Sequence, residues 1–297
     1  MTHTNFSPLT LVASKVDTRV QRAMRHVMAF LLEKSIPFFV EAECNHALSL
    51  GATHTVELPD VTTGLLVSVG GDGSLLQLVE HACRYDLPVV GVHSGNVGFL
   101  SDITLDNLDA LSSIVAGKYA FESRSLLGAS FQDDQQEILL GPALNEFVIS
   151  SSTPGRLIRY SLSHQDKVIA HHQADGIIIA TATGSTAYAL SAGGPVISPA
   201  IACNLLLPVC PHKLSSRPIV YSSNETVSVT LHTPNDHDAV IAYDGHKGRS
   251  LLASAKITVH THQKKLRLVH PPGYDFFGTL QNKLHWEMHH HDPGYHY

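Results

Sequence analysis

A glycine-rich segment with a single acid is the part of the chain best suited to chemistry. It reads GGDGS at residues 70–74 and follows an apolar run at residues 65–69. Glycines at the end of a strand let the backbone approach a ligand closely, and the N–H groups of a following helix attract anions, so the segment suits a phosphate. It is not a Walker A loop, and Leu76 takes the place of the third glycine of a dinucleotide GxGxxG motif.

The acid in this segment, Asp72, needs its own explanation. A carboxylate repels phosphate oxygens, so Asp72 is expected to accept a proton from a nucleophilic hydroxyl or to help hold a cation. The alternative is a structural role, in which Asp72 caps the following helix or stabilises a turn.

Two further segments carry polar groups without a high charge. Residues 91–100 (GVHSGNVGFL) follow the apolar run at 88–92 and are expected beside the first glycine segment, at the carboxyl edge of a sheet. Residues 183–195 (TGSTAYALSAGGP) combine small and hydroxyl side chains with one aromatic ring. They suit hydrogen bonding to a polar heterocycle, although a loop and short helix with Ser/Thr caps is the simpler interpretation.

The elements that must position these segments change in type along the chain. Apolar runs at 8–13, 36–40, 65–69 and 88–92 alternate with helical patterns, the first of them after the N-cap candidate Asp17. This alternation predicts a parallel sheet in a Rossmann-like α/β domain, residues 1–102. Short β-rich segments with turn signals follow from about residue 117 and predict a β-sandwich, residues 103–270. A tail, residues 271–297, is expected to pack back on the N-terminal domain and to end in disorder.

Composition excludes several classes of protein. The 297 residues are 43% hydrophobic and 15% charged, which argues against intrinsic disorder, and a net charge of −6 without a Lys/Arg run argues against nucleic-acid binding. Residues 176–211 contain no charged residue or histidine, but their prolines and the pair Gly193-Gly194 argue against a membrane span. The four cysteines form no CxxC pair and no apolar signal segment opens the chain, so a cytoplasmic location is expected. The histidine-rich tail is not assigned to a metal.

Five blocks in order resemble the bacterial NAD kinases. They are GGDGS at 70–74, GVHSGNVGFLSD at 91–102, NE at 145–146, ADGIIIATATGSTAYALSAGGPVISP at 174–199 and PHKLSSRPIV at 211–220. The resemblance implies the two-domain fold of that family and transfer of the ATP γ-phosphoryl group to the 2′-hydroxyl of the adenosine ribose of NAD, which makes NADP. It further implies Mg²⁺ or another divalent cation with ATP, NAD and ATP as small-molecule partners, and a homodimer or homotetramer.

The resemblance also implies residue roles. Asp72 would accept the proton of the ribose hydroxyl, in the phosphate loop of Gly70, Gly71, Gly73 and Ser74, with Gly73 contacting substrate through its backbone. Asn145 and Glu146 would hold ribose and diphosphate groups, and Asp175 would meet the nicotinamide end. The adenosine would lie on Thr186, Ala187, Tyr188, Ala189, Leu190 and Ser191. Arg159 and His246 match substrate-facing positions more loosely, and no residue is assigned as a metal ligand.

Two other functions fit part of the sequence. A diacylglycerol- or sphingosine-type lipid kinase shares the GGDG loop, but it gives no reason for the polar segment at 183–191, and the chain shows no basic amphipathic helix for a bilayer. A non-catalytic NAD(P) sensor would use the same binding residues, but it has no need of Asp72. The sequence leaves open polyphosphate as donor, NADH as acceptor and feedback by NADP(H).

Overall fold

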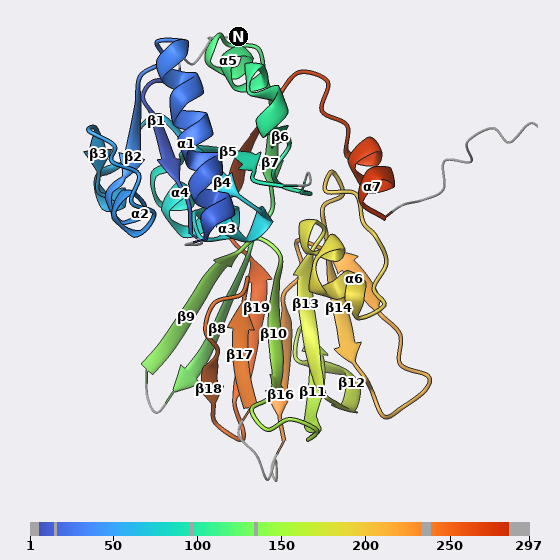
Figure 1. Cartoon of the computed structure of the whole chain (residues 1–297). Coiled ribbons are helices and arrows are strands. Elements are labelled where there is room, and N and C mark those ends of the chain that lie inside the picture. The colour runs from blue at the N-terminus through green and yellow to red at the C-terminus, as the bar shows by residue number, and fades with distance from the viewer. Residues whose placement is uncertain (1–5, 15–16, 96–97, 134–135, 233–238, 285–297) are drawn as a thin grey trace, which may run out of the picture. The chain divides into compact units, whose positions relative to one another are not determined.

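The computed structural model describes residues 6–14, 17–95, 98–133, 136–232 and 239–284. The chain divides into two compact units (Figure 1). The N-terminal unit comprises Met1–Glu122 with Arg267–Tyr297, and the C-terminal unit comprises Ser123–Leu266. One unit is built on a mostly parallel sheet and the other on antiparallel sheets, so the predicted fold class is confirmed.

An eight-stranded sheet forms the centre of the N-terminal unit. The strand order is β3-β2-β1-β4-β5-β20-β7, and β6 pairs with β5. The strands are β1 (Leu9–Val12), β2 (Phe38–Glu41), β3 (Thr55–Val56), β4 (Leu65–Gly70), β5 (Pro88–His93), β6 (Ile103–Thr104), β7 (Ala120–Arg124) and β20 (Leu266–His270). Strands β1 and β4 are buried along their whole length, as expected for a parallel sheet that is covered on both faces.

Helices follow several of these strands. They are α1 (Thr18–Glu33), α2 (Ala42–Ala47), α3 (Asp72–Leu76), α4 (Val79–Tyr85), α5 (Asp109–Val115) and α7 (Phe276–Leu284), with short 3₁₀ turns at Leu58–Asp60 and Leu105–Asn107. The carboxylate of Asp17 accepts a hydrogen bond from the N–H of Val20 at 2.8 Å and so caps α1, as predicted. Helices α1 and α5 share one hydrophobic core with β1, β4 and β5.

Two six-stranded antiparallel sheets form the C-terminal unit. Their orders are β15-β14-β13-β10-β17-β18 and β12-β11-β16-β19-β8-β9. The strands are β8 (Leu127–Asp133), β9 (Gln136–Ala143), β10 (Glu146–Ser151), β11 (Ile158–His164), β12 (Lys167–Ala174), β13 (Gly176–Thr181), β14 (Cys203–Val209), β15 (Ile219–Ser222), β16 (Val227–Leu231), β17 (Ala239–Tyr243), β18 (Arg249–Leu251) and β19 (Lys256–Thr261). One core contains buried residues from both sheets, as in a sandwich. The 3₁₀ turn Thr183–Thr186 and helix α6 (Tyr188–Ser191) follow β13.

The units begin and end at different residues from those expected. The first unit continues past residue 102 to Glu122, because α5 packs Leu111 and Ile114 into the core of the parallel sheet. Strand β20 pairs with β5 in parallel, so residues 267–270 belong to this unit and not to the sandwich. Helix α7 also belongs to the N-terminal unit, whereas the predicted disordered end lies outside the described residues.

The uncharged stretch at 176–211 supplies strands of the sandwich. Residues Ile177, Ile178, Ile179 and Ala180 of β13 are fully buried, which explains why this stretch has no charge. In the part of the chain that the structure describes, no helix combines the length and the apolar character that crossing a bilayer requires.

Candidate active site

Strands β1 and β4 lie side by side at the point where the chain reverses its direction across the parallel sheet. After β1 the chain continues to β2 and β3 on one side, and after β4 it continues to β5 on the other side. Open α/β sheets bind ligands outside the carboxyl ends of the strands at such a point. The carboxyl ends of β4 and β5 carry Gly70 and His93, and Ser14 follows β1 two residues later.

Asp72 joins the two glycine-rich segments in this unit. Its Oδ2 accepts a hydrogen bond from the N–H of Phe99 at 2.8 Å, and its Oδ1 accepts one from the N–H of Leu100 at 3.1 Å. Asp72 therefore does not cap α3, whose N-cap residue is Gly71. Since both donors are backbone groups, the carboxylate is held in one orientation while each oxygen keeps a further lone pair.

Glycines allow the close contacts around Asp72. A Cβ atom on Gly98 would lie 1.9 Å from Oδ1 of Asp72, so any side chain there would displace the carboxylate or the connection. A Cβ on Gly70 would lie 2.3 Å from Oγ of Ser74. The Ser74 hydroxyl is buried and accepts a hydrogen bond from Ser14 at 3.1 Å, so it ties β1 to the turn after β4.

Three basic side chains that the sequence reasoning missed lie at this edge: His93 is close to Asp72, and Arg19 and Lys283 are close to His93. Burial lowers the pKa of His93, the positive charges of Lys283 and Arg19 lower it further, and the negative charge of Asp72 opposes them. A Cβ built on Gly95 would lie 3.5 Å from Nη1 of Arg19 and 3.7 Å from Nδ1 of His93. Arg19 lies in the first turn of α1 and Lys283 in the last turn of α7, so only the fold brings them to the glycine segments.

A buried histidine fixes the end of the second glycine-rich segment. Nδ1 of His270 pairs with Asp102, Nε2 lies 3.1 Å from Oε2 of Glu122, and the ring stacks on Tyr274 with centroids 3.8 Å apart. Burial alone would lower the pKa of His270, but the hydrogen bonds and charges of the two carboxylates raise it above its usual value. A protonated His270 thus holds Asp102, two residues after the N–H groups that bind Asp72.

In the C-terminal unit, a second aspartate organises the pair Asn145-Glu146. Oδ2 of Asp244 accepts a hydrogen bond from the N–H of Leu144 at 2.5 Å, and Oδ1 accepts from the N–H groups of Asn145 at 2.8 Å and Glu146 at 3.1 Å. Asp244 lies in the turn after β17 and is 3% exposed. The sequence shows Asp244-Gly245 only as a turn signal, so this role was not predicted.

Glu146 lies in an environment that favours its neutral form. Burial and the neighbouring Asp244 raise its pKa to about 8, although a hydrogen bond from the backbone N–H of Tyr188 opposes the shift. Burial likewise raises the pKa of Asp244, against three backbone N–H donors. Oε2 of Glu146 is buried and has no hydrogen-bond partner among the described residues. A carboxyl group in this state can both donate and accept hydrogen bonds near neutral pH.

The segment at 183–191 packs against this pair. Gly184 lies so close to Asn145 that a Cβ would meet its carbonyl oxygen at 2.1 Å, and Thr181 donates to the carbonyl of Leu144 at 2.6 Å. The rest of the segment forms the 3₁₀ turn and α6, in which Ala189 is buried and Tyr188 is 45% exposed. The structure therefore brings Asn145, Glu146 and the predicted segment of Thr186, Ala187, Tyr188, Ala189, Leu190 and Ser191 together.

The other predicted residues of this unit fall into two groups. His246 lies close to Asp244 and so to the pair Asn145-Glu146, because the centroid of its ring lies 4.6 Å from that of Tyr243 and its charge acts on Asp244. Asp175 and Arg159 lie elsewhere: Glu146 pairs with Ala180, whereas Ser150, at the other end of β10, pairs with Gly176. At about 3.3 Å per residue, the start of β13 is roughly 13 Å from the Asn145-Glu146 pair. The structure does not bring Asp175 and Arg159 to that pair within one chain.

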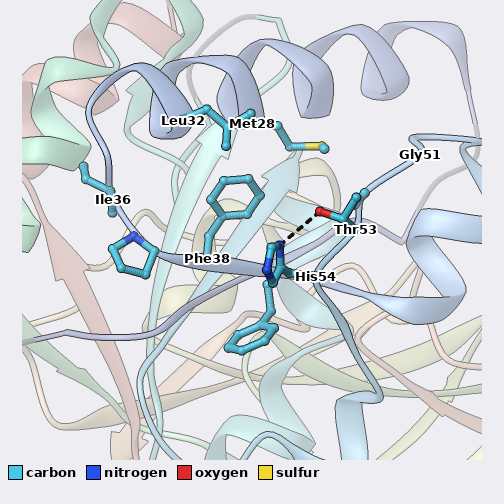
Figure 2. Close-up of a pocket in the computed structure, with 10 residues that line it drawn as sticks. Met28, Leu32, Ile36, Phe38, Gly51, Thr53 and His54 are labelled. Atoms are coloured by element: carbon cyan, nitrogen blue, oxygen red, sulfur yellow. Dashed lines mark hydrogen bonds between the residues drawn. The ribbon is translucent and has the colours of Figure 1, made fainter.

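An apolar pocket of about 440 Å³ in the N-terminal unit has the wrong chemistry for a nucleotide. It lies between α1, β2 and residues 51–54. Figure 2 shows Met28 and Leu32 above the ring of Phe38, and His54 Nδ1 hydrogen-bonded to Thr53 at 3.1 Å. No residue that lines it is an acid, a lysine or an arginine, so it offers no fixed charge to a phosphate.

Both halves of the chain match family models. The model described as the ATP-NAD kinase N-terminal domain matches residues 9–119, and that of the ATP-NAD kinase C-terminal domain matches residues 144–271. The chain is similar to an NAD kinase of Legionella pneumophila (strain Corby), with 34% identity over 281 residues, which cover 93% of this chain and 94% of that relative.

Solved structures share the fold. A crystal structure of yeast NADH kinase complexed with NADH superposes with a TM-score of 0.84 at 20% identity, covering 94% of this chain and 88% of that one. A crystal structure of an NAD kinase from Archaeoglobus fulgidus in complex with ATP gives a TM-score of 0.70 at 24% identity, covering 94% and 99%. Since the relative from Legionella is about one-third identical along nearly its whole length and both family models match, this chain belongs to the NAD kinase family.

Proposed function

We propose that this chain transfers the γ-phosphoryl group of ATP to the 2′-hydroxyl of the adenosine ribose of NAD, which makes NADP. Membership of the family supports the reaction. The observation that carries the assignment of its machinery is the Asp72 carboxylate, which two backbone N–H groups hold beside a glycine turn at the ligand-binding edge of a parallel sheet. A lipid kinase is disfavoured because the likeness to NAD kinases extends through the C-terminal unit.

Asp72 acts as the proton acceptor. The 2′-hydroxyl oxygen forms a bond to the γ-phosphorus as the bond from that phosphorus to the β,γ-bridging oxygen breaks, and ADP leaves with the bonding electrons. The hydroxyl proton moves to the carboxylate of Asp72, which already has two backbone donors and retains a free lone pair on each oxygen. In phosphoryl transfer most of the remaining catalysis comes from alignment and charge stabilisation.

The phosphates of ATP lie at the glycine turn of Gly70, Gly71 and Gly73. Arg19 and Lys283 supply positive charge there, since their charges both act on His93 beside Asp72, and His93, whose pKa is lowered, offers an imidazole for hydrogen bonding. The buried Ser74 hydroxyl contributes by holding the turn against Ser14. A divalent cation accompanies ATP, and Mg²⁺ is the cation that we propose. The described residues include no group of three or more His, Cys, Asp or Glu side chains that could hold a metal, so we assign its ligands to the phosphates and not to a protein cluster.

The acceptor nucleotide binds in the C-terminal unit. Tyr188 offers an exposed ring and hydroxyl to the adenosine, and the other small and hydroxyl residues of the segment at 186–191 surround it. Asn145 and Glu146, fixed by Asp244, bind ribose hydroxyls, and a neutral Glu146 can donate as well as accept. His246 contributes a further imidazole next to this pair.

Asp175 and Arg159 support a homo-oligomer. They lie away from the Asn145-Glu146 pair of their own chain, so we propose that Asp175 meets the nicotinamide end of NAD bound to a neighbouring copy in a homodimer or homotetramer, with Arg159 nearby. Light scattering on the purified chain, together with mixing of Asp175→Ala and Asp72→Asn chains, tests this arrangement. Recovery of activity in the mixture is expected, and a monomer of full activity would contradict it. We propose a cytoplasmic location, where NAD and ATP are available.

Substitution of Asp72 tests the general-base role. Asp72→Asn is expected to keep NAD binding within a few-fold and to lower turnover by roughly 10²- to 10⁴-fold. The matched control is Asp86→Asn, an exposed aspartate of the same unit that pairs with Arg267. Initial rates with NAD, NADH and diacylglycerol as acceptors, each with ATP and Mg²⁺, identify the substrate class. Unchanged turnover of Asp72→Asn would refute the role of the carboxylate, and phosphorylation of diacylglycerol alone would refute the proposed reaction.

A further inference from the structure

Basic and hydroxyl side chains gather around a second pocket, which lies in the C-terminal unit. The pocket has a volume of about 390 Å³ and is lined by residues of β12 and of the connection from β14 to β15. Figure 1 shows these two segments of the C-terminal unit. Its polar lining consists of His171, His172, Lys213, Ser215, Ser216 and Arg217. None of these residues belongs to the candidate active site, and no acid lines the pocket.

The connection that carries Lys213 and Arg217 has a defined conformation. The N–H of His212 donates to the carbonyl of Gln173 at 2.9 Å, which ties the connection to the end of β12. Nη1 of Arg217 donates to the carbonyls of Leu214 at 2.7 Å and Ser216 at 2.8 Å, so the guanidinium folds back on its own loop. The guanidinium of Arg217 is therefore held in place, and Lys213 lines the same pocket as His171 and His172.

The positive charge of this cluster is not compensated. Among the described residues no carboxylate lies within ion-pair distance of Lys213 or Arg217, although the whole chain carries a net charge of −6. Burial lowers the pKa of His172, and the positive charges of Lys213 and His171 lower it further. Such a group of cations without a counter-charge favours an anion in the pocket.

Two residues that line the pocket also carry buried polar atoms without a partner in the described part of the chain. Nδ1 of His172 and Oγ of Ser216 are buried and have no hydrogen-bond partner among the described residues. Buried polar atoms are nearly always paired, so an unpaired one points to a missing group. A ligand with several oxygens and more than one negative charge would match the two cations that line the pocket. Phosphate groups have this combination of charge and acceptor oxygens.

We propose that this pocket is an anion site that binds the phosphate or diphosphate group of a small molecule. The proposal does not depend on the assignment of Asp72, because it rests on residues of the C-terminal unit alone. Its ligand is recognised by charge and by several acceptor oxygens, and a neutral nucleoside is not expected to bind there.

Lysine footprinting tests the site without interference from anions bound elsewhere. The full chain is acetylated with N-hydroxysuccinimide acetate in the presence of inorganic diphosphate, and mass spectrometry follows each lysine separately. Diphosphate at about 10 mM is expected to slow acetylation of Lys213 about tenfold, as for a site with a Kd of roughly 1 mM. Lys167 is the internal control, since it is exposed at the other end of β12. Adenosine should protect neither lysine.

Two variants test the other members of the cluster. Arg217→Gln removes a cation, and His171→Gln removes an exposed imidazole that makes no hydrogen bond to the loop and so leaves the conformation of Arg217 intact. Each is expected to raise the concentration of diphosphate that gives half-protection of Lys213, by about tenfold for Arg217→Gln. Failure of diphosphate to protect Lys213, equal protection of Lys167, protection by adenosine, or unchanged half-protection in both variants would overturn the proposal.

Discussion

Replacement of Glu146 by glutamine should reveal how strongly the fold favours a neutral side chain at this position. Glu146 is 7% exposed, and its neighbours are Asp244 and the N–H of Tyr188. Its pKa is raised from 4.5 to about 8, so the folded chain binds a proton more tightly than the unfolded chain does. Stability from this proton is fully present below pH 4.5 and is lost as the pH rises towards 8. Glutamine has the same shape, keeps an oxygen for Tyr188 and cannot ionise.

The magnitude follows from linkage. At about 1.4 kcal/mol per pH unit, the raised pKa corresponds to roughly 5 kcal/mol of unfolding free energy between the two pKa values. The carboxyl in the wild type would lose stability over this range, and the amide in Glu146→Gln would not. The variant is therefore expected to gain several kcal/mol relative to the wild type on going from pH 5 to pH 9, starting from a small difference of either sign at pH 5.

Urea unfolding followed by circular dichroism measures this difference. Curves at pH 5, 6, 7, 8 and 9 give the unfolding free energy of each protein, and every other titrating group is shared by both. Glu137→Gln is the matched control, because Glu137 is exposed on β9 of the same unit and the substitution is chemically identical. The control should run parallel to the wild type at every pH. A Glu146→Gln curve that also ran parallel to the wild type would refute the inference that burial and Asp244 hold this carboxyl neutral.

Three further substitutions test the contacts that position the substrates. Gly98→Ala places a Cβ 1.9 Å from Oδ1 of Asp72 and should lower kcat by about 100-fold or more in steady-state assays, and a normal kcat would show that the clamp on the carboxylate is dispensable. Gly184→Ala places a Cβ 2.1 Å from the carbonyl oxygen of Asn145 and should lower the free energy of unfolding in urea by about 1–3 kcal/mol. Calorimetry should also show weaker binding of NAD, and an unaltered NAD affinity would contradict the packing argument. Arg19→Met should raise the KM for ATP about fivefold or more, as expected for loss of a charged contact, and leave the KM for NAD unchanged; the reverse pattern would place Arg19 on the acceptor side.

Local sequence signals predicted the elements that depend on neighbouring residues. Asp17 and the helical apolar spacing after it predicted α1, and the order of strand, glycines and helix located Asp72 at the end of β4. The signals failed where pairing joins distant residues. Strand β20 was expected in the sandwich, but it pairs in parallel with β5, more than 170 residues earlier, and a pairing over that separation leaves no signal in the neighbouring residues.

Strand β14 shows how an element can be missed. The prolines of this stretch were used only as evidence against a membrane span, and no strand was predicted at residues 203–209, where Pro208 cannot donate to a sheet. The structure shows how the proline is accommodated, because β15 pairs with β14 only from Cys203 to Leu206. Pro208 lies beyond that pairing, so the missing N–H costs nothing on that side of the sheet.

Side-chain chemistry selected Asp72 and the family resemblance selected Glu146, but neither indicated the groups that hold these acids. The structure shows that backbone N–H groups bind Asp72 and also Asp244, the neighbour of Glu146. Asp72 accepts from two successive N–H groups after Gly98, and Asp244 accepts from three successive N–H groups just before and within β10. A backbone donor leaves no mark in the residue letters, so neither contact could be predicted from composition or spacing.

Both units thus contain a carboxylate that accepts hydrogen bonds from consecutive backbone N–H groups. This arrangement has one physical consequence for the glycine-containing motifs. A carboxylate that binds consecutive backbone N–H groups needs the chain to approach closely, and a glycine permits that approach at Gly98 beside Asp72 and at Gly184 beside Asn145. These motifs therefore determine backbone geometry as well as side-chain chemistry. A methyl group added at Gly98 would clash with Asp72, and one added at Gly184 would clash with the backbone of Asn145. Substitutions at the glycines should therefore damage the reaction without removing any group that touches the substrate, and this separates positioning from chemistry in a way that substitution of Asp72 alone cannot.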